Sequence, residues 1–264
     1  MLISFHDWIY SAYPPQRAIV NGRYGAIHIA TILFCIALVI AISLLHKKDK
    51  RTRAAVIKML AFAILLFEVI RRVINFTRGE PMTTDTVLYY LLPRPWCAIS
   101  CWMTIAAALT ERKALYNFSA MCSLLCALVF FVYPVVGFNH GVYLFEDIYS
   151  ISTHSLLFVT SLSMMTLGLT DFRYHREHGK GAWQELFLLC LTFTYAFVEI
   201  FVLKIEKDPL YFRPGNDVQK VFGFSYPVFL VVYVGFLLIY FNAFYIVPYL
   251  VQHYHKPKAL HAVA

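Results

Sequence analysis

The chain has 264 residues, of which 60% are hydrophobic, 17% are aromatic and only 14% are charged. This composition is too apolar for a soluble domain of this length, so we expect an integral membrane protein. The net charge of +8 does not indicate a nucleic-acid partner, because the basic residues lie in short segments between long apolar runs. We predict that the chain binds no nucleic acid.

Residues 1–24 precede the first apolar run and differ from a signal peptide. They lack a basic start followed by an unbroken apolar stretch, and they contain several aromatic residues and a proline pair. Aromatic side chains favour the headgroup region of a bilayer. We therefore expect an uncleaved segment that lies at the membrane interface.

Seven apolar runs approach or exceed the length of about 20 residues that spans the hydrocarbon core. The pattern predicts an all-α fold: one polytopic helical bundle over residues 1–264 with about seven transmembrane helices. The runs are 25–45, 54–76, 91–109, 114–136, 148–169, 185–203 and 225–247.

The basic residues predict the orientation of this bundle. The connections at 46–53, 110–113 and 170–183 and the tail at 250–264 carry most of the lysine and arginine. Such segments stay in the cytoplasm, so we expect an outside N-terminus, a cytoplasmic C-terminus and a location in the cell membrane.

The outer ends of the first two runs carry polar residues. His28 opens the first run, and the second run ends with Glu68, Arg71 and Arg72. Glu68 and Arg72 are one helical turn apart, so they can form an ion pair. Ionisable groups within a membrane span are costly and often mark a site, although a purely structural pair is an equal alternative here.

The third run begins with the residues LPRPWC at 92–97. Pro93 suits the first turn of a helix, and Trp96 suits the membrane interface. Cys97 would then lie about 9–10 Å below the helix start, with Arg94 one turn before it. Since cysteine is often buried without reacting, this thiol alone is weak support for chemistry.

The fifth and sixth runs add further polar residues to the outer half of the bundle. Ser150 and His154 are one turn apart, about 9 Å below the outer end of the fifth run. Tyr195 and Glu199 are one turn apart near the outer end of the sixth. Each alone is compatible with a structural role: an interior histidine, or a glutamate bonded to a tyrosine.

The cysteines do not form a metal-binding or disulfide pattern. All six fall inside apolar runs, without C-x-x-C spacing or histidines at zinc spacing. We expect no metal and no cofactor.

The start of the third run resembles a known family. The residues LPRPWC at 92–97, together with His154 and the Glu68, Arg71 and Arg72 end of the second run, are similar to the YwaF and transmembrane protein 164 family of multispan membrane proteins. The resemblance implies a lipid-acting enzyme, an acyltransferase that uses the cysteine. It also implies a fold like that of the androgen-induced hydrolases, which use threonine and histidine. In the bacterial pattern a histidine precedes the cysteine by two positions; here Pro95 stands there, so His154 or His28 would have to replace it.

These observations lead to one hypothesis for the mechanism. Cys97 would attack a lipid ester, and His154 would act as the base, oriented by Glu199 or Glu68. Polar residues in the outer half of the bundle would bind the substrate, with an arginine holding the lipid phosphate. These substrate-binding residues are Glu68, Arg71, Arg72, Arg94 and His28. Membrane lipids are the expected partners, with transfer or hydrolysis decided by the acceptor.

A second class of function also fits the polar layer. A small-solute transporter or binding protein would use the same Glu, Arg and His residues as a pocket. Transporters usually have discontinuous helices around a site at mid-membrane, whereas Pro93 and Pro95 lie at a helix end. A retinal pigment is excluded, because the seventh run contains no lysine.

Overall fold

The computed structural model describes residues 4–10, 24–77, 83–93, 96–133, 137–138, 143–173, 182–203 and 213–254. Within these ranges every regular element is a helix and there is no strand, which confirms the all-α prediction. The long helices are α2 (Ala26–Ser43), α3 (Lys50–Thr77), α5 (Trp96–Thr110), α6 (Lys113–Val132), α7 (Phe145–Thr166), α8 (Trp183–Phe197) and α10 (Tyr226–Tyr254). The short ones are α1 (Phe5–Tyr10), α4 (Thr84–Leu91) and α9 (Asp217–Phe222), with a 3₁₀ turn at Leu44–Lys47 and a π-helical turn at Val198–Val202.

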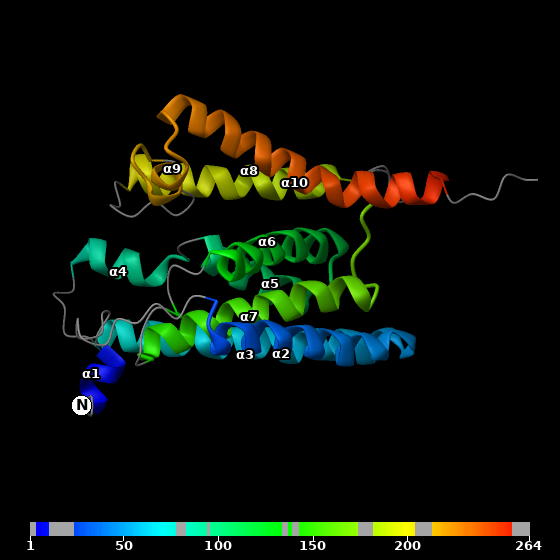
Figure 1. Ribbon diagram of the computed structural model, residues 1–264, viewed down its shortest axis with the longest axis horizontal. Helices are drawn as coiled ribbons and strands as arrows, with labels where there is room; N and C mark the ends of the chain where they lie inside the picture. Colours follow the sequence, from blue (N-terminus) through cyan, green and yellow to red (C-terminus); the bar gives the residue numbers. More distant parts are fainter. Residues whose placement is uncertain are drawn as a thin grey trace, which may run out of the picture.

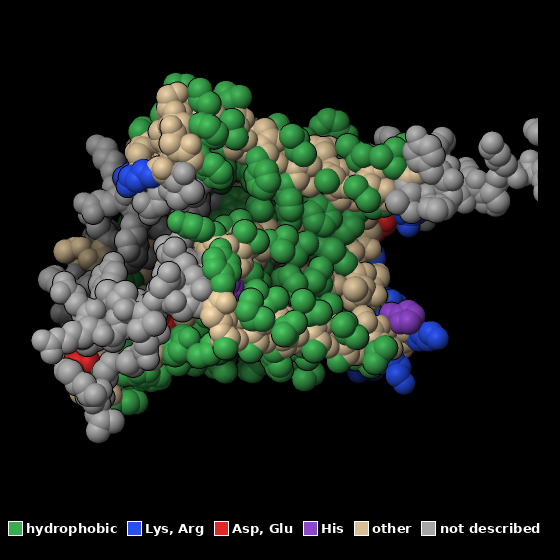
Figure 2. Space-filling view, in the orientation of Figure 1, with side chains coloured by type: hydrophobic (Ala, Val, Ile, Leu, Met, Phe, Trp, Pro, Cys, Tyr) green, Lys and Arg blue, Asp and Glu red, His purple; other side chains and the backbone are tan. Residues whose placement is uncertain are grey.

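Four of the helical segments are both long and apolar enough to cross a membrane: Ala26–Lys47, Lys113–Val132, Trp183–Val202 and Tyr226–Leu250. Figure 2 shows the corresponding surface, with hydrophobic side chains covering the middle of the visible face and basic side chains at its right end. An apolar band of this extent is expected of a protein whose solvent is lipid.

The long helices run side by side, with α6 and α3 each packed against α5 and α7, and α2 packed against α7 (Figure 1). Helix α8 contacts α6 on the side away from α2. The short helices α1, α4 and α9 gather at one end, on the left of Figure 1. We call this the cysteine end, because α5 begins there with Trp96 and Cys97; the opposite end, with residues 46–53, 111–113 and 167–173, is the basic end.

Small and hydroxylated residues explain the close contact between α5 and α6. Thr104 Oγ1 lies 2.7 Å from Ser119 Oγ and 3.0 Å from Ser123 Oγ, and all three side chains are buried. Short side chains let two helices approach, and their hydroxyl groups bond across the interface. These bonds hold the middle of α5 against α6.

The structure corrects the predicted start of the third run. Leu91 ends α4 and α5 begins only at Trp96, so Pro93 lies before the helix and not in its first turn. Two prolines explain the break, because a residue that precedes proline is driven toward extended backbone, and Leu92 has ψ 140°. Cys97 is therefore the second residue of its helix instead of lying 9–10 Å inside it.

Other predicted boundaries also move. Helix α7 begins at Phe145, three residues earlier than predicted, because Asp147 accepts a hydrogen bond from the Leu144 N–H group and caps the helix. At the C-terminus α10 continues to Tyr254, so the first residues of the predicted tail are helical. Of the predicted interfacial segment, α1 is a short helix anchored by Trp8 Nε1, which donates to the Tyr143 carbonyl at 2.8 Å; residues 11–23 lie outside the described ranges.

Candidate functional site at the cysteine end

Glu68 is the centre of a buried polar network between α3 and α7. Its carboxylate is fully buried and accepts short hydrogen bonds from the Tyr149 hydroxyl and from Arg72. Arg72 also lies over the Trp102 ring, with Cζ 5.1 Å from the ring centroid. The predicted pair of Glu68 and Arg72 is therefore present, and Tyr149 satisfies the second carboxylate oxygen.

Arg71 is held differently from Arg72. Its guanidinium carbon is 4.6 Å from the centroid of the Tyr149 ring, and its Nε is 3.8 Å from Glu146 Oε2. Arg71 Nε is buried and makes no hydrogen bond with any described residue. An N–H group of a permanent cation that forms an ion pair but no hydrogen bond can still donate to an anionic ligand.

Cys97 lies at the start of α5, within electrostatic reach of both Arg71 and Glu68. The thiol is half-buried and forms no disulfide bond. Unpaired N–H groups give the first turn of a helix a partial positive charge, which favours a nearby anion. Burial of a thiol disfavours its charged form, so deprotonation here requires a base that acts during the reaction.

His154 has the hydrogen bonding expected of such a base. Its Nδ1 is 2.7 Å from the Ser150 carbonyl oxygen, which only accepts, so Nδ1 carries the proton and Nε2 has the free lone pair. The ring stacks on Phe130 at 4.0 Å with an interplanar angle of 9°. His154 is also within electrostatic reach of Arg71, while no hydrogen bond joins it to Cys97 in the described part of the chain.

Glu199 is fully buried within the π-helical turn that follows α8. The Tyr195 hydroxyl donates to Glu199 Oε1 at 2.6 Å, as the one-turn spacing predicted, and lies 3.4 Å from the Pro93 carbonyl oxygen. This contact brings the end of α8 next to the segment that leads into α5. Isolated π-helical turns are uncommon and are frequent at functional sites.

The remaining two predicted residues stand apart from this network. His28 is fully buried between aromatic rings, stacked on Phe138 at 4.3 Å, and its Nδ1 accepts the Tyr24 N–H at 3.0 Å. That environment is typical of a packed interior histidine and brings it into no described contact with Glu68 or Arg71. Arg94 lies outside the described residues.

Comparison with known proteins extends this description. The model of the TMEM164 family matches residues 23–245 of the 264-residue chain. The chain belongs to the TMEM164 family. This confirms the resemblance predicted from the start of the third run and, with the apolar helices, identifies a membrane protein. No curated protein and no solved structure matches the chain.

The part of the chain that matches the TMEM164 family contains every predicted site residue and also residues that sequence reasoning missed. Tyr149, Glu146 and Phe130 each contact a predicted residue directly. Glu146, Tyr149 and Thr153 follow one another at three- and four-residue spacing, so one face of α7 could have been recognised as polar. Phe130 carried no comparable signal, because it is one of many apolar residues in its run.

The residues of the candidate site supply complementary chemistry. A thiol can act as a nucleophile, and the free Nε2 lone pair of His154, on the adjoining helix α7, can act as a base. Arg71 provides a positive charge with an N–H group that makes no hydrogen bond to a described residue, and Tyr149 donates a hydrogen bond to Glu68. This combination is suited to covalent catalysis on an anionic, ester-containing substrate.

Proposed function

We propose that the chain is a membrane-embedded lipid acyltransferase or lipid hydrolase in which Cys97 is the nucleophile and His154 is the base. The observation that carries the proposal is the group of residues at this end: a thiol at a helix start within electrostatic reach of the partly buried Arg71, and a histidine of fixed tautomer on α7. Both residues lie within the part of the chain that the family model matches.

The first half of the reaction forms an acyl-enzyme. His154 Nε2 takes the proton of the Cys97 thiol while the sulfur attacks the carbonyl carbon of a lipid ester, forming a C–S bond. The tetrahedral intermediate collapses by breaking the ester C–O bond. His154 then gives its proton to the departing alkoxide, which leaves as a lysolipid alcohol.

The second half returns the enzyme to its starting state. A hydroxyl group of an acceptor lipid, or of water, attacks the thioester carbon and loses its proton to His154. The C–S bond then breaks, and the thiolate regains the proton from the imidazolium. A lipid acceptor makes the reaction a transfer, and water makes it a hydrolysis.

Arg71 is better suited than Arg72 to bind the phosphate of the lipid. Arg72 already donates to Glu68 and covers Trp102, whereas Arg71 Nε is buried without a hydrogen-bond partner among the described residues. A guanidinium group binds phosphate through two parallel N–H bonds. Glu68 and Tyr149 would hold Arg71 in place through the ring of Tyr149. Tyr195 and Glu199 would support the backbone that precedes Cys97.

The seven long helices are proposed to be seven transmembrane spans of a cell-membrane protein. With the basic end in the cytoplasm, the N-terminus and the site around Cys97 face outward. Labelling with a membrane-impermeant thiol reagent tests this orientation: a cysteine at Lys48 should react only from the cytoplasmic side, and one at Phe5 only from outside. Both residues are exposed at opposite ends of the bundle. Reaction of the Phe5 variant only from the cytoplasm would reverse the proposed orientation.

Turnover of a labelled phospholipid by the purified protein tests the chemistry. Cys97→Ala should abolish the release or transfer of the acyl chain, and His154→Ala should reduce it by a factor on the order of 10²–10⁴. Cys101→Ala is the matched control, because this second cysteine is one turn further along α5 and should be near neutral. Full turnover by folded Cys97→Ala would end the acyl-enzyme proposal and leave the transporter or binding protein.

A further inference from the structure

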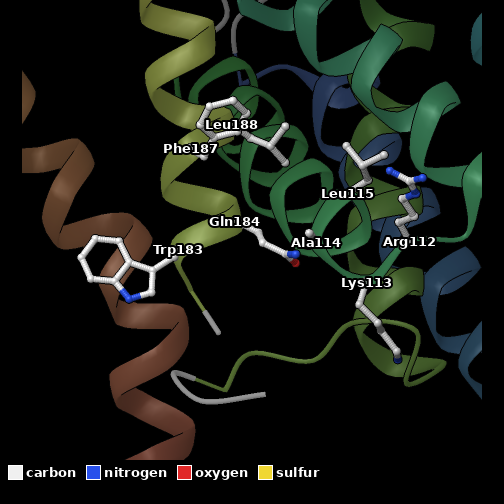
Figure 3. Close-up of a pocket in the computed structure, with 8 residues that line it drawn as sticks. All are labelled: Arg112, Lys113, Ala114, Leu115, Trp183, Gln184, Phe187 and Leu188. Atoms are coloured by element: carbon white, nitrogen blue, oxygen red, sulfur yellow. The ribbon is translucent and has the colours of Figure 1, made fainter. Parts of the chain in front are cut away.

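A groove of about 780 Å³ lies at the basic end of the bundle, between the starts of α6 and α8. Figure 3 shows Arg112 and Lys113 on the α6 side, Trp183 and Phe187 on the α8 side, and Gln184 pointing across toward Ala114. Because Cys97 lies at the other end of α5, this groove is separate from the site described above.

The α6 rim of the groove is positively charged. Arg112 and Lys113 are both exposed, and Lys113 is within electrostatic reach of Asp171 and of three more cations. Two nearby acids pair with other cations, Asp171 with Arg173 and Glu111 with Lys58, each at 2.7 Å, and a third, Glu185, is buried and accepts a hydrogen bond from Asn117. The three further cations are Lys50, Arg53 and Arg173.

Backbone carbonyl groups accept hydrogen bonds from part of this cluster. Lys113 Nζ donates to the Leu169 carbonyl at 2.9 Å, and Arg53 donates to the Leu167 carbonyl at 2.5 Å. These neutral partners hold the side chains but do not cancel their charge. An uncompensated positive charge at this end therefore remains for an anion outside the protein.

The other wall of the groove is apolar and exposed. Trp183 is 71% exposed and Phe187 is 66% exposed, while Leu115 and Leu188 line the groove between the two helices. Tryptophan at the end of an apolar helix is typical of the headgroup region of a bilayer. A ligand that fits both walls has an anionic head and a hydrocarbon chain.

We propose that this groove binds an anionic phospholipid of the surrounding membrane. The phosphate lies at the α6 rim, where Arg112 and Lys113 contact it, and Gln184 donates a hydrogen bond to the head group. One acyl chain runs along Leu115, Leu188 and Phe187 toward the bilayer core. The volume is within the range of about 300–1,000 Å³ that holds a ligand of moderate size.

Binding of such a lipid would join α6 to α8, which has few other connections to the bundle. Asn117 of α6 bonds Glu185 of α8 at 2.9 Å beside the groove, and Tyr240 of α10 donates to the Met121 carbonyl at 2.8 Å. A lipid seated against both helices would add contacts at the same end. The ligand is therefore expected to raise the melting temperature as well as to bind.

Native mass spectrometry of the full chain, purified in detergent with equal phosphatidylglycerol and phosphatidylcholine, tests the proposal. The wild-type protein should retain phosphatidylglycerol preferentially and melt at a higher temperature when it is added. Arg112→Gln should lower the retained fraction about five-fold, from the contribution of one arginine beside an anionic lipid. The double variant Arg112→Gln/Lys113→Gln should lose most of the preference.

Two matched controls distinguish binding in the groove from binding by general surface charge or general surface hydrophobicity. Lys47→Gln/Lys48→Gln removes two exposed cations from the same end but outside the groove, and should bind as the wild type does. Phe187→Ala removes the apolar wall and should lower retention, whereas Phe197→Ala, at 57% exposure on the same helix, should leave it unchanged.

Several results would overturn the proposal. An equal loss in the Lys47→Gln/Lys48→Gln control would show that diffuse charge attracts the lipid. Equal retention of phosphatidylcholine, or no loss in the folded Arg112→Gln variant, would remove the charged contact. Displacement of the lipid by millimolar inorganic phosphate would indicate a simple anion site instead of a lipid groove.

Discussion

Removing Arg72 should destabilise the protein far more than removing Arg72 and the charge of Glu68 together. The Glu68 carboxylate is fully buried and Arg72 has a side-chain exposure of only 16%, so Arg72→Met leaves an uncompensated charge in a dry layer. Loss of one partner of a buried pair costs about 3–5 kcal/mol. The lower end, about 3 kcal/mol, is expected here, because Arg71 remains within electrostatic reach of Glu68.

The double variant Glu68→Gln/Arg72→Met removes both charges. It keeps an amide oxygen that can accept a hydrogen bond from the Tyr149 hydroxyl. Its destabilisation should be smaller than that of Arg72→Met by at least about 1 kcal/mol. Tyr149→Phe should cost about 1.5–3 kcal/mol, since it deletes one hydrogen bond to a charged group.

The free energy of unfolding is measured in mixed micelles by titration with SDS, under one condition, for the wild type, Glu68→Gln, Arg72→Met, the double variant and Tyr149→Phe. A thermodynamic cycle over the two single variants and the double variant then gives the coupling of Glu68 and Arg72 directly. Additive losses would show that these two side chains do not stabilise each other and would refute the buried network.

Three further predictions follow from single contacts. Phe130→Leu keeps an apolar residue but removes the ring that stacks on His154. Lipid turnover should therefore fall about ten-fold, while the free energy of unfolding should change by less than about 1.5 kcal/mol. Unchanged turnover would show that the stack does not position the imidazole. Gly137 has φ +102°, and an added Cβ would lie 3.0 Å from the Ile151 side chain. Gly137→Ala should therefore lower the free energy of unfolding by about 1–3 kcal/mol in a denaturant titration. A neutral result would contradict this backbone geometry. The pKa of Glu111 is lowered, chiefly because Lys58 donates a hydrogen bond to its carboxylate. The pair therefore stabilises the fold at pH values above the ordinary glutamate pKa. This stabilisation is lost as the pH falls through the lowered pKa. Glu111→Gln should therefore lower the melting temperature at pH 7 but not at pH 3, and an equal change at both would exclude the ion pair.

Much of the helical layout could be predicted from the sequence, because apolar runs of membrane length leave the backbone few alternatives to a helix. The pairing of Glu68 with Arg72 and of Tyr195 with Glu199 followed from one-turn spacing and is present. The helix starts were less predictable. The shift of α5 to Trp96 depends on the combined effect of Pro93 and Pro95, which a hydropathy pattern does not register.

The parts of the site that depend on packing could not be predicted. Spacing gave no reason to choose Tyr149 as the second partner of Glu68, or Phe130 as the support of His154, since both contacts join different helices. His28 was placed in the polar layer from its depth alone. The structure shows instead that the rings of Phe131 and Phe138 surround it, because depth in a bundle does not determine which direction a side chain faces.

Capture of the acyl-enzyme tests the account most directly. The purified protein is incubated with a phospholipid that carries a labelled acyl chain, quenched with acid, and digested for mass spectrometry. We predict an acyl mass on the peptide that contains Cys97, removed by hydroxylamine and missing from Cys97→Ala. Continued turnover with no adduct on Cys97, or with an adduct on Cys101 alone, would contradict Cys97 as the nucleophile.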